Sequence, residues 1–168
     1  MKNPLLLCVA SLFLTSCAGY QLGSPRPRAM EGIQTLAVPN FENKTLEPRI
    51  EVLVTDTVIQ QLQQDGTFRI VGEKEADAVI RGKIVSLNRY KARSLRRNTL
   101  ASSEFTLELK VEYTVTKRST GEEVLRRDVS GSTTFFISQD LNQDERQAIP
   151  LAAAKLAVEM TSQLSEGW

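Results

Sequence analysis

Residues 105–115 alternate between apolar and polar side chains along their whole length, and this pattern restricts the fold more than any other feature. Side chains of a strand point to opposite faces in turn, so the pattern predicts a strand with one buried and one hydrated face. Residues 119–121 then predict a hairpin turn, and residues 124–137 the returning strand, with a bulge at Gly131. Phe135 and Phe136 are adjacent on that strand, so we expect them to face opposite sides. The apolar set is Phe105, Leu107, Leu109, Val111, Tyr113 and Val115.

Two other segments carry apolar residues at helical spacing. The first is residues 50–62, and Gly66 is expected to end that helix. The second is residues 149–164, where Pro150 leaves two options. The helix either begins at Pro150, or begins near Asn142 and kinks at the proline. We favour the earlier start, because Asp144 and Glu145 suit the positive end of a helix.

Two further strands are predicted at residues 33–38 and 78–87. Residues 68–71 are expected to form a short strand or extended segment, and residues 40–48 are expected to form a polar loop. The element order is then strand–helix–strand–strand–strand–helix. This order predicts an α+β fold: a two-layer sandwich in which two helices pack on one face of a mostly antiparallel, four-stranded sheet.

The N-terminal sequence predicts that the protein is exported from the cytoplasm. Lys2 precedes an apolar run that begins at Pro4 and ends in Leu14-Thr15-Ser16-Cys17, as in a secretory signal peptide. The run is shorter than the ~20 residues of a membrane-spanning helix. Its end resembles a bacterial lipobox, which implies cleavage before Cys17, diacylglycerol on the Cys17 sulfur and a fatty acyl group such as palmitate on the new amino group. The alternative is an ordinary signal with a cysteine at its cleavage site. We therefore divide the chain into a signal peptide (1–16), a lipidated tether (17–32) and one α+β domain (33–168).

Composition argues against several classes of function. The chain has no histidine, and its two cysteines are Cys8 in the signal and Cys17. Histidine–cysteine metal sites and Cys–His nucleophiles are therefore excluded from the mature chain. Glu73, Glu75 and Asp77 are expected to form a solvated turn. Removal of residues 1–16 takes away Lys2 and leaves equal numbers of basic and acidic residues, which argues against nucleic acid as a partner. We predict a protein that is not an enzyme and has no metal and no cofactor beyond the covalent lipid.

Three segments resemble the LptE family of lipoproteins. They are Cys17-Ala18-Gly19-Tyr20-Gln21-Leu22, in which Ala18 is an insertion relative to the family pattern; residues 36–45 with Pro48 and residues 66–71; and residues 76–84. The resemblance implies a lipid-anchored plug of the LptD outer-membrane β-barrel, at the periplasmic face of the outer membrane. Such a plug assists assembly of the barrel and helps to deliver lipopolysaccharide to the outer leaflet. Ala18 after the lipid-bearing cysteine agrees with sorting to that membrane.

The second segment is also similar to curli-secretion lipoproteins and to activators of penicillin-binding proteins. The alternative function is therefore a regulatory lipoprotein that activates a peptidoglycan synthase or serves another secretion assembly. About 15 residues separate Cys17 from the first strand and span roughly 50 Å at most, which is short for reaching an inner-membrane enzyme. The tether length favours the plug.

A cationic stretch is the candidate binding site. Residues 88–103, expected to form a loop, contain five basic residues and no acidic one: Arg89, Lys91, Arg93, Arg96 and Arg97. Arginine binds phosphates and carboxylates through two parallel hydrogen bonds, so this loop suits lipopolysaccharide. Tyr90 is expected to meet acyl chains or sugar faces. The alternatives are contact with acidic side chains of the barrel lumen, or a solvated loop without a ligand.

Overall fold

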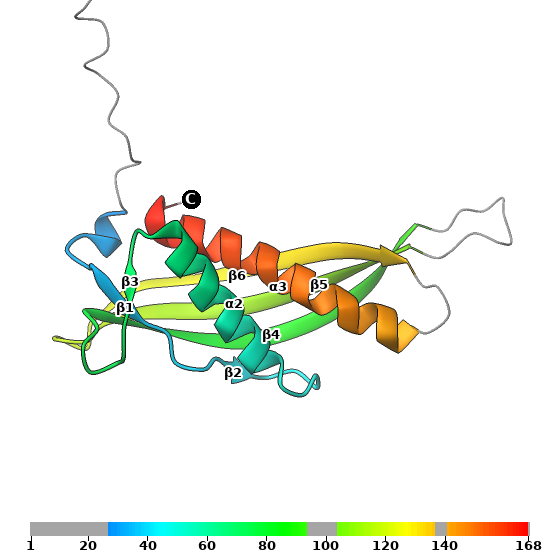
Figure 1. Cartoon of the computed structure of the whole chain (residues 1–168), viewed down its shortest axis with the longest axis horizontal. Helices are drawn as coiled ribbons and strands as arrows, with labels where there is room; N and C mark the ends of the chain where they lie inside the picture. Colours follow the sequence, from blue (N-terminus) through cyan, green and yellow to red (C-terminus); the bar gives the residue numbers. More distant parts are fainter. Residues whose placement is uncertain (1–26, 94–103, 137–140, 168) are drawn as a thin grey trace, which may run out of the picture.

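The protein is described by a computed structural model that covers residues 27–93, 104–136 and 141–167. Figure 1 shows a long sheet with two helices along one face. The elements are η1 (Arg28–Met30), β1 (Thr35–Ala37), β2 (Glu42–Asn43), α2 (Ile50–Asp65), β3 (Arg69–Ile70), β4 (Ala78–Arg93), β5 (Glu104–Lys117), β6 (Glu123–Phe136) and α3 (Leu141–Ser165).

Over the described residues the sheet is mixed and has six strands, so the prediction of four mostly antiparallel strands was wrong, while the α+β class is confirmed. The strand order is β3-β1-β4-β5-β6, and β2 also pairs with β4. The β4–β5–β6 part is antiparallel. Strand β1, however, pairs in parallel with β3 and β4, and β2 pairs in parallel with β4. The parallel part arises because α2 crosses between β1 and β3, and a helical crossover returns the chain in the same direction. Strands β2 and β3 have two residues each, too few to show an alternating pattern.

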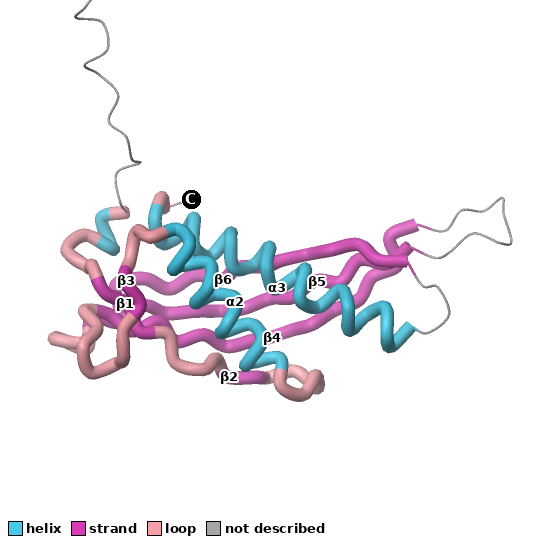
Figure 2. The backbone as a smooth tube through the Cα atoms, viewed as in Figure 1, coloured by secondary structure: helices cyan, strands magenta, loops and turns pink. Residues whose placement is uncertain are grey.

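Helices α2 and α3 lie side by side on one face of the sheet (Figures 1 and 2). Helix α2 buries Ile50, Val54, Val58 and Leu62, and it ends at Gly66, which adopts a positive φ of 73°. Helix α3 begins at Leu141 and continues through Pro150, which confirms the earlier of the two predicted starts. Among the residues described, neither helix combines the length and apolarity needed to cross a bilayer.

The alternation of β5 places its apolar residues in the core, as predicted. Leu107, Leu109, Val111, Tyr113 and Val115 are buried beneath the two helices, while their polar neighbours face the other side. On β6, Phe135 is 8% exposed and Phe136 is 60% exposed, so the two rings do face opposite sides. The helices and one face of the sheet therefore enclose the core, and the opposite face stays open.

The predicted bulge at Gly131 is wrong. Gly131 pairs in regular register with Leu109, and the shift between β5 and β6 lies at Val115 and Thr116 instead. The glycine is needed for a different reason. A Cβ at this position would lie 2.1 Å from the carbonyl oxygen of Ala152 and 2.4 Å from the nitrogen of Leu156. Helix α3 thus rests directly on the backbone of β6.

Candidate functional site

The open face of the sheet is polar and hollowed. The half of this face around residues 81–83 of β4, which we call its first half, forms a cavity of about 830 Å³. The walls of the cavity carry charged side chains of β4, β5 and β6. Three ion pairs balance these charges: Arg81–Glu73 at 3.5 Å, Lys83–Glu42 at 3.7 Å and Lys110–Asp128 at 3.1 Å. The paired side chains are largely exposed, and such pairs contribute only about 0–1 kcal/mol to stability. This half of the face is hydrated and close to neutral.

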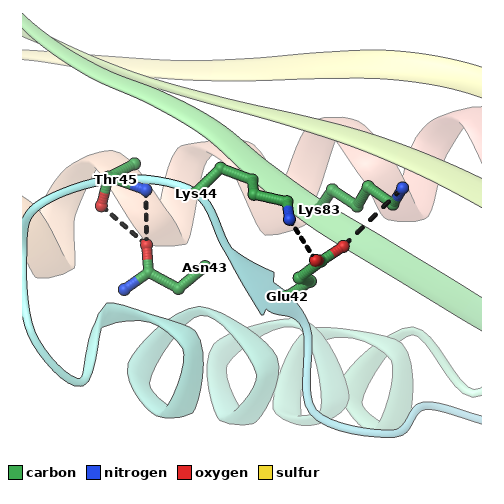
Figure 3. A network of polar contacts seen from close by, with 5 residues as sticks. All are labelled: Glu42, Asn43, Lys44, Thr45 and Lys83. Carbon is green, nitrogen blue, oxygen red and sulfur yellow. Dashed lines mark hydrogen bonds and ion pairs between the residues drawn. The ribbon is translucent and has the colours of Figure 1, made fainter.

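Strand β2 forms one wall of the cavity and was not predicted, because residues 40–48 were expected to be a loop. Its Glu42 pairs with both Lys44 and Lys83 (Figure 3). The hydrogen bond from Lys44, more than any other contact, lowers the pKa of Glu42. The ring of Phe41 packs over Gly82 of β4, where a Cβ would lie 2.6 Å from the ring. These contacts attach the segment to β4.

Asn43 fixes the loop that follows β2. Its Oδ1 accepts hydrogen bonds from the Thr45 nitrogen and the Thr45 hydroxyl, both at 2.8 Å (Figure 3). Its Nδ2 donates to the Glu47 carbonyl at 2.8 Å and to the Glu51 carboxylate at 3.1 Å. Asparagine often holds the backbone two residues onward in this way. The Asn43-Lys44-Thr45 sequence was therefore the available signal for an ordered turn.

Asp77 holds β1 against the start of β4. Its carboxylate accepts hydrogen bonds from the nitrogens of Gln34 (3.0 Å) and Thr35 (2.9 Å), and its own nitrogen donates to the Thr35 hydroxyl at 2.8 Å. The hydrogen bond from Gln34, followed by those from Thr35, lowers the pKa of Asp77. Glu73, Glu75 and Asp77 are all exposed, as predicted for a solvated turn, but the sequence did not reveal this role of Asp77.

The cationic stretch is not one loop. Strand β4 continues to Arg93, so Arg89, Lys91 and Arg93 belong to a strand paired with β5, which corrects the predicted loop over residues 88–103. Arg96 and Arg97 lie outside the described residues. The polar sequence of residues 88–93 concealed the strand, because long Arg and Lys stems can occupy positions where aliphatic residues were expected.

The strand geometry separates the basic residues from Tyr90. By register, Arg89 and Lys91 pair with Leu107 and Phe105, whose alternating set faces the helices, whereas Tyr90 pairs with Thr106 on the open side. The hydroxyl of Tyr90 lies 3.3 Å from a Glu108 carboxylate oxygen. Tyr90 and Phe136 are both exposed and make the far half of the open face more aromatic than the first half.

Arg89 is engaged within the protein. Its guanidinium forms an ion pair with Glu145 of α3 and lies 5.9 Å from the centre of the Phe105 ring. The Phe105 and Phe135 rings are 6.0 Å apart. Lys91, by contrast, is exposed and has no ion pair with any described residue. Arg89 therefore joins α3 to the sheet, whereas the Lys91 side chain is available for a ligand.

The first described residue and the described part of the cationic stretch lie at opposite ends of the sheet. Pro27, the first described residue, is next to Gly167 near the end of α3, whereas β4 ends and β5 begins at the other end (Figure 1). Cys17 lies outside the described residues. Within the described ranges no three acidic or cysteine side chains group together in a way that could hold a metal ion.

Comparisons with solved structures show the same fold. A dodecamer formed by a variant of PelC from Paraburkholderia phytofirmans is 15% identical with a TM-score of 0.55, over 84% of this chain and 94% of that chain. A minor lipoprotein from Acinetobacter baumannii is 16% identical with a TM-score of 0.52, over 79% and 92%. A protein from Xanthomonas campestris is 12% identical with a TM-score of 0.56, over 86% and 92%. No curated protein sequence matches this chain.

One family model matches the chain. It is described as LptE, lipopolysaccharide-assembly, and it covers residues 33–164, from just before β1 to the last turn of α3.

Proposed function

Because this chain belongs to the LptE family of lipopolysaccharide-assembly proteins, we propose that it is a lipid-anchored plug of an LptD-type outer-membrane β-barrel. In this role it assists assembly of the barrel and helps to deliver lipopolysaccharide to the outer leaflet. The family match over residues 33–164 is the observation that carries the proposal.

The open face of the sheet suits a barrel lumen. The interior of a large outer-membrane barrel is polar and hydrated. The first half of the open face offers charges already balanced by pairs such as Lys110–Asp128, so it can lie against such a wall without burying an unpaired charge.

The anchor is the lipid on Cys17. Nine residues lie between Cys17 and Pro27, where the described structure begins, and this segment spans roughly 35 Å at full extension. Two or more acyl chains hold a protein stably at a membrane. Replacement of Cys17 with serine should therefore release the protein from the membrane fraction.

Lipopolysaccharide would contact the cationic end of the sheet. Lys91, Arg93, Arg96 and Arg97 supply positive charge for its phosphates, and Tyr90 offers an exposed ring for sugar faces. Arg89 contributes differently, since its guanidinium is already paired with Glu145. Its role is to hold α3 near this end.

Gentle detergent extraction of native membranes tests the plug. A C-terminal tag on the full-length protein should recover a large outer-membrane barrel in stoichiometric amount. Recovery of the protein alone would contradict the proposal. Recovery with a peptidoglycan synthase would favour the regulatory alternative instead.

Charge reversal tests the ligand contact. A variant with Arg93, Arg96 and Arg97 changed to glutamate should bind purified lipopolysaccharide more weakly, and wild-type binding should weaken as salt rises, because exposed charges are screened. The matched control changes Arg28, Arg69 and Lys74 to glutamate, since these exposed residues belong to η1, β3 and the turn before β4, away from the β4–β5 end, and alter net charge equally. Equal binding by both variants would exclude the cationic end.

A further inference from the structure

The loop between β2 and α2 presents a surface that the proposed function does not assign. We propose that Leu46 and the hollow beside it, which we call the knob and the hole, form the contact that anchors this protein to its barrel partner. The partner segment would carry an apolar side chain that enters the hole and carboxylates beside it. This inference rests on the proposed function for the identity of the partner.

The knob is an exposed side chain on a fixed loop. Leu46 is fully exposed, at 103% of its reference area. A single exposed leucine needs no explanation on a mobile loop. Here, however, Asn43 holds the residues on both sides of Leu46 through Thr45 and Glu47, and the Glu47 nitrogen also donates to the Thr45 hydroxyl at 3.2 Å. A contact made by a loop that is already ordered loses little conformational freedom on binding.

The backbone next to the knob is strained. Arg49 has a φ of 65°, and it is the only non-glycine residue with a positive φ in the described ranges. It occupies the N-cap position of α2, where its side chain makes no capping hydrogen bond. Such strain persists only where the surrounding structure enforces it, and it gathers at functional sites. In this loop the left-handed residue Arg49 lies three positions after Leu46 and directly before α2.

The hole lies between the starts of α2 and α3. It has a volume of about 150 Å³, and Pro48, Ile50, Leu53 and Ile149 supply its apolar lining. This volume is of the order of one branched or aromatic side chain, although the hole is a depression open to solvent rather than an enclosed cavity. Interface hot spots are commonly anchors of this kind in pockets that exclude water.

The charges beside the hole indicate the chemistry of the partner. Arg49 and Arg146 line it and are exposed, and neither forms an ion pair with a described residue. Glu47 is the one acidic residue among those that line the hole. The net positive rim favours carboxylates on the partner, which guanidinium groups bind well. A lipid surface fits less well, because membrane binding needs a broad apolar face and the loop offers a single leucine.

The first experiment compares two matched variants of the full-length tagged protein. Leu46→Asp should reduce the recovered barrel at least tenfold after detergent extraction. Val158→Asp, on the outer side of α3 where the side chain is 54% exposed, should leave recovery unchanged. Both changes add one charge at a solvent-facing position, so both variants should fold. Equal recovery by Leu46→Asp and the wild type would overturn the inference and leave the proposed function intact. Absence of the barrel from the wild-type extract would overturn both.

The second experiment identifies what touches the knob. A photo-crosslinking amino acid at position 46 should label the barrel, in a peptide that contains an apolar residue next to aspartate or glutamate. Labelling of lipid, or of a peptide without carboxylates, would overturn the inference. Arg49→Glu combined with Arg146→Glu should reduce the labelling several-fold.

Discussion

The contact between Gly131 and α3 predicts a large effect from one methyl group. In Gly131→Ala the new Cβ would sit 2.1 Å from the Ala152 carbonyl oxygen, while ordinary contacts begin near 3.4 Å. Both nearest atoms belong to the backbone of α3, so no side-chain rotation can relieve the overlap. The helix and the strand must therefore separate by more than about 1 Å along a contact that closes the core.

The expected loss of stability follows from that geometry. Overpacking a core costs about 1–3 kcal/mol, and we expect about 3 kcal/mol because the blocking atoms are backbone atoms. For a chain of this size that loss lowers Tm by roughly 6–12 °C. Gly72→Ala is the matched control, since a Cβ there would meet nothing within 4 Å and its φ is not positive. It should be neutral or stabilise the protein by up to about 1 kcal/mol.

Urea unfolding followed by circular dichroism measures both variants. A free energy of unfolding for Gly131→Ala equal to that of Gly72→Ala would refute the reasoning. It would mean that α3 can move away from β6 at no cost, and that the helix is not fixed on the sheet.

Three other predictions concern single contacts. Because the pKa of Asp77 is lowered, its contribution to stability is present above about pH 4 and is lost as the pH falls through the lowered value. In urea unfolding measured from pH 2 to 6, the free energy of unfolding of Asp77→Asn should therefore depend less on pH than that of the wild type. An unchanged acid profile would contradict the hydrogen bonds to its carboxylate. The Thr161 hydroxyl is buried without a hydrogen-bond partner among the described residues, so Thr161→Val should raise the free energy of unfolding by about 1 kcal/mol; a loss of stability would reveal a partner. A double-mutant cycle of Arg89→Ala and Glu145→Ala should give a coupling energy of about 0.2–1 kcal/mol, because the pair is partly exposed, and additive effects would show that the pair is not formed in solution.

The long elements of the fold could be predicted because each has a strong period. Eleven alternating residues defined β5, and helical spacing defined α2 and α3. The parallel part of the sheet could not be predicted in the same way. Strands β2 and β3 are too short to have a period, and their pairing depends on long-range contacts such as those of Asp77 with Gln34 and Thr35. A local pattern carries no information about such partners.

The face of the sheet on which each basic residue lies depends on a register shift in β4 that the alternation of the sequence does not show. Counted outward from Ile84, simple alternation places Tyr90 on the helix side and Arg89 and Lys91 on the open side. The register of β4 shifts between Ile84 and Ser86, and this shift reverses all three positions. An extra residue in a strand exchanges the two faces beyond it. Sequence could identify the cluster of charge, but the face each charge occupies depended on that shift.

The separation of the tether from the cationic end gives the domain the properties of a spacer. Strand β4 has 16 residues, and a strand rises about 3.3 Å per residue, so it spans roughly 50 Å. The hydrocarbon core of a bilayer is about 30 Å thick. With the Pro27 end at the inner leaflet, an upright sheet would carry its far end to the level of the outer leaflet. The length of one strand would then set the height at which the protein meets its ligand, and shortening β4 and β5 together would lower that height without altering a single contacting residue.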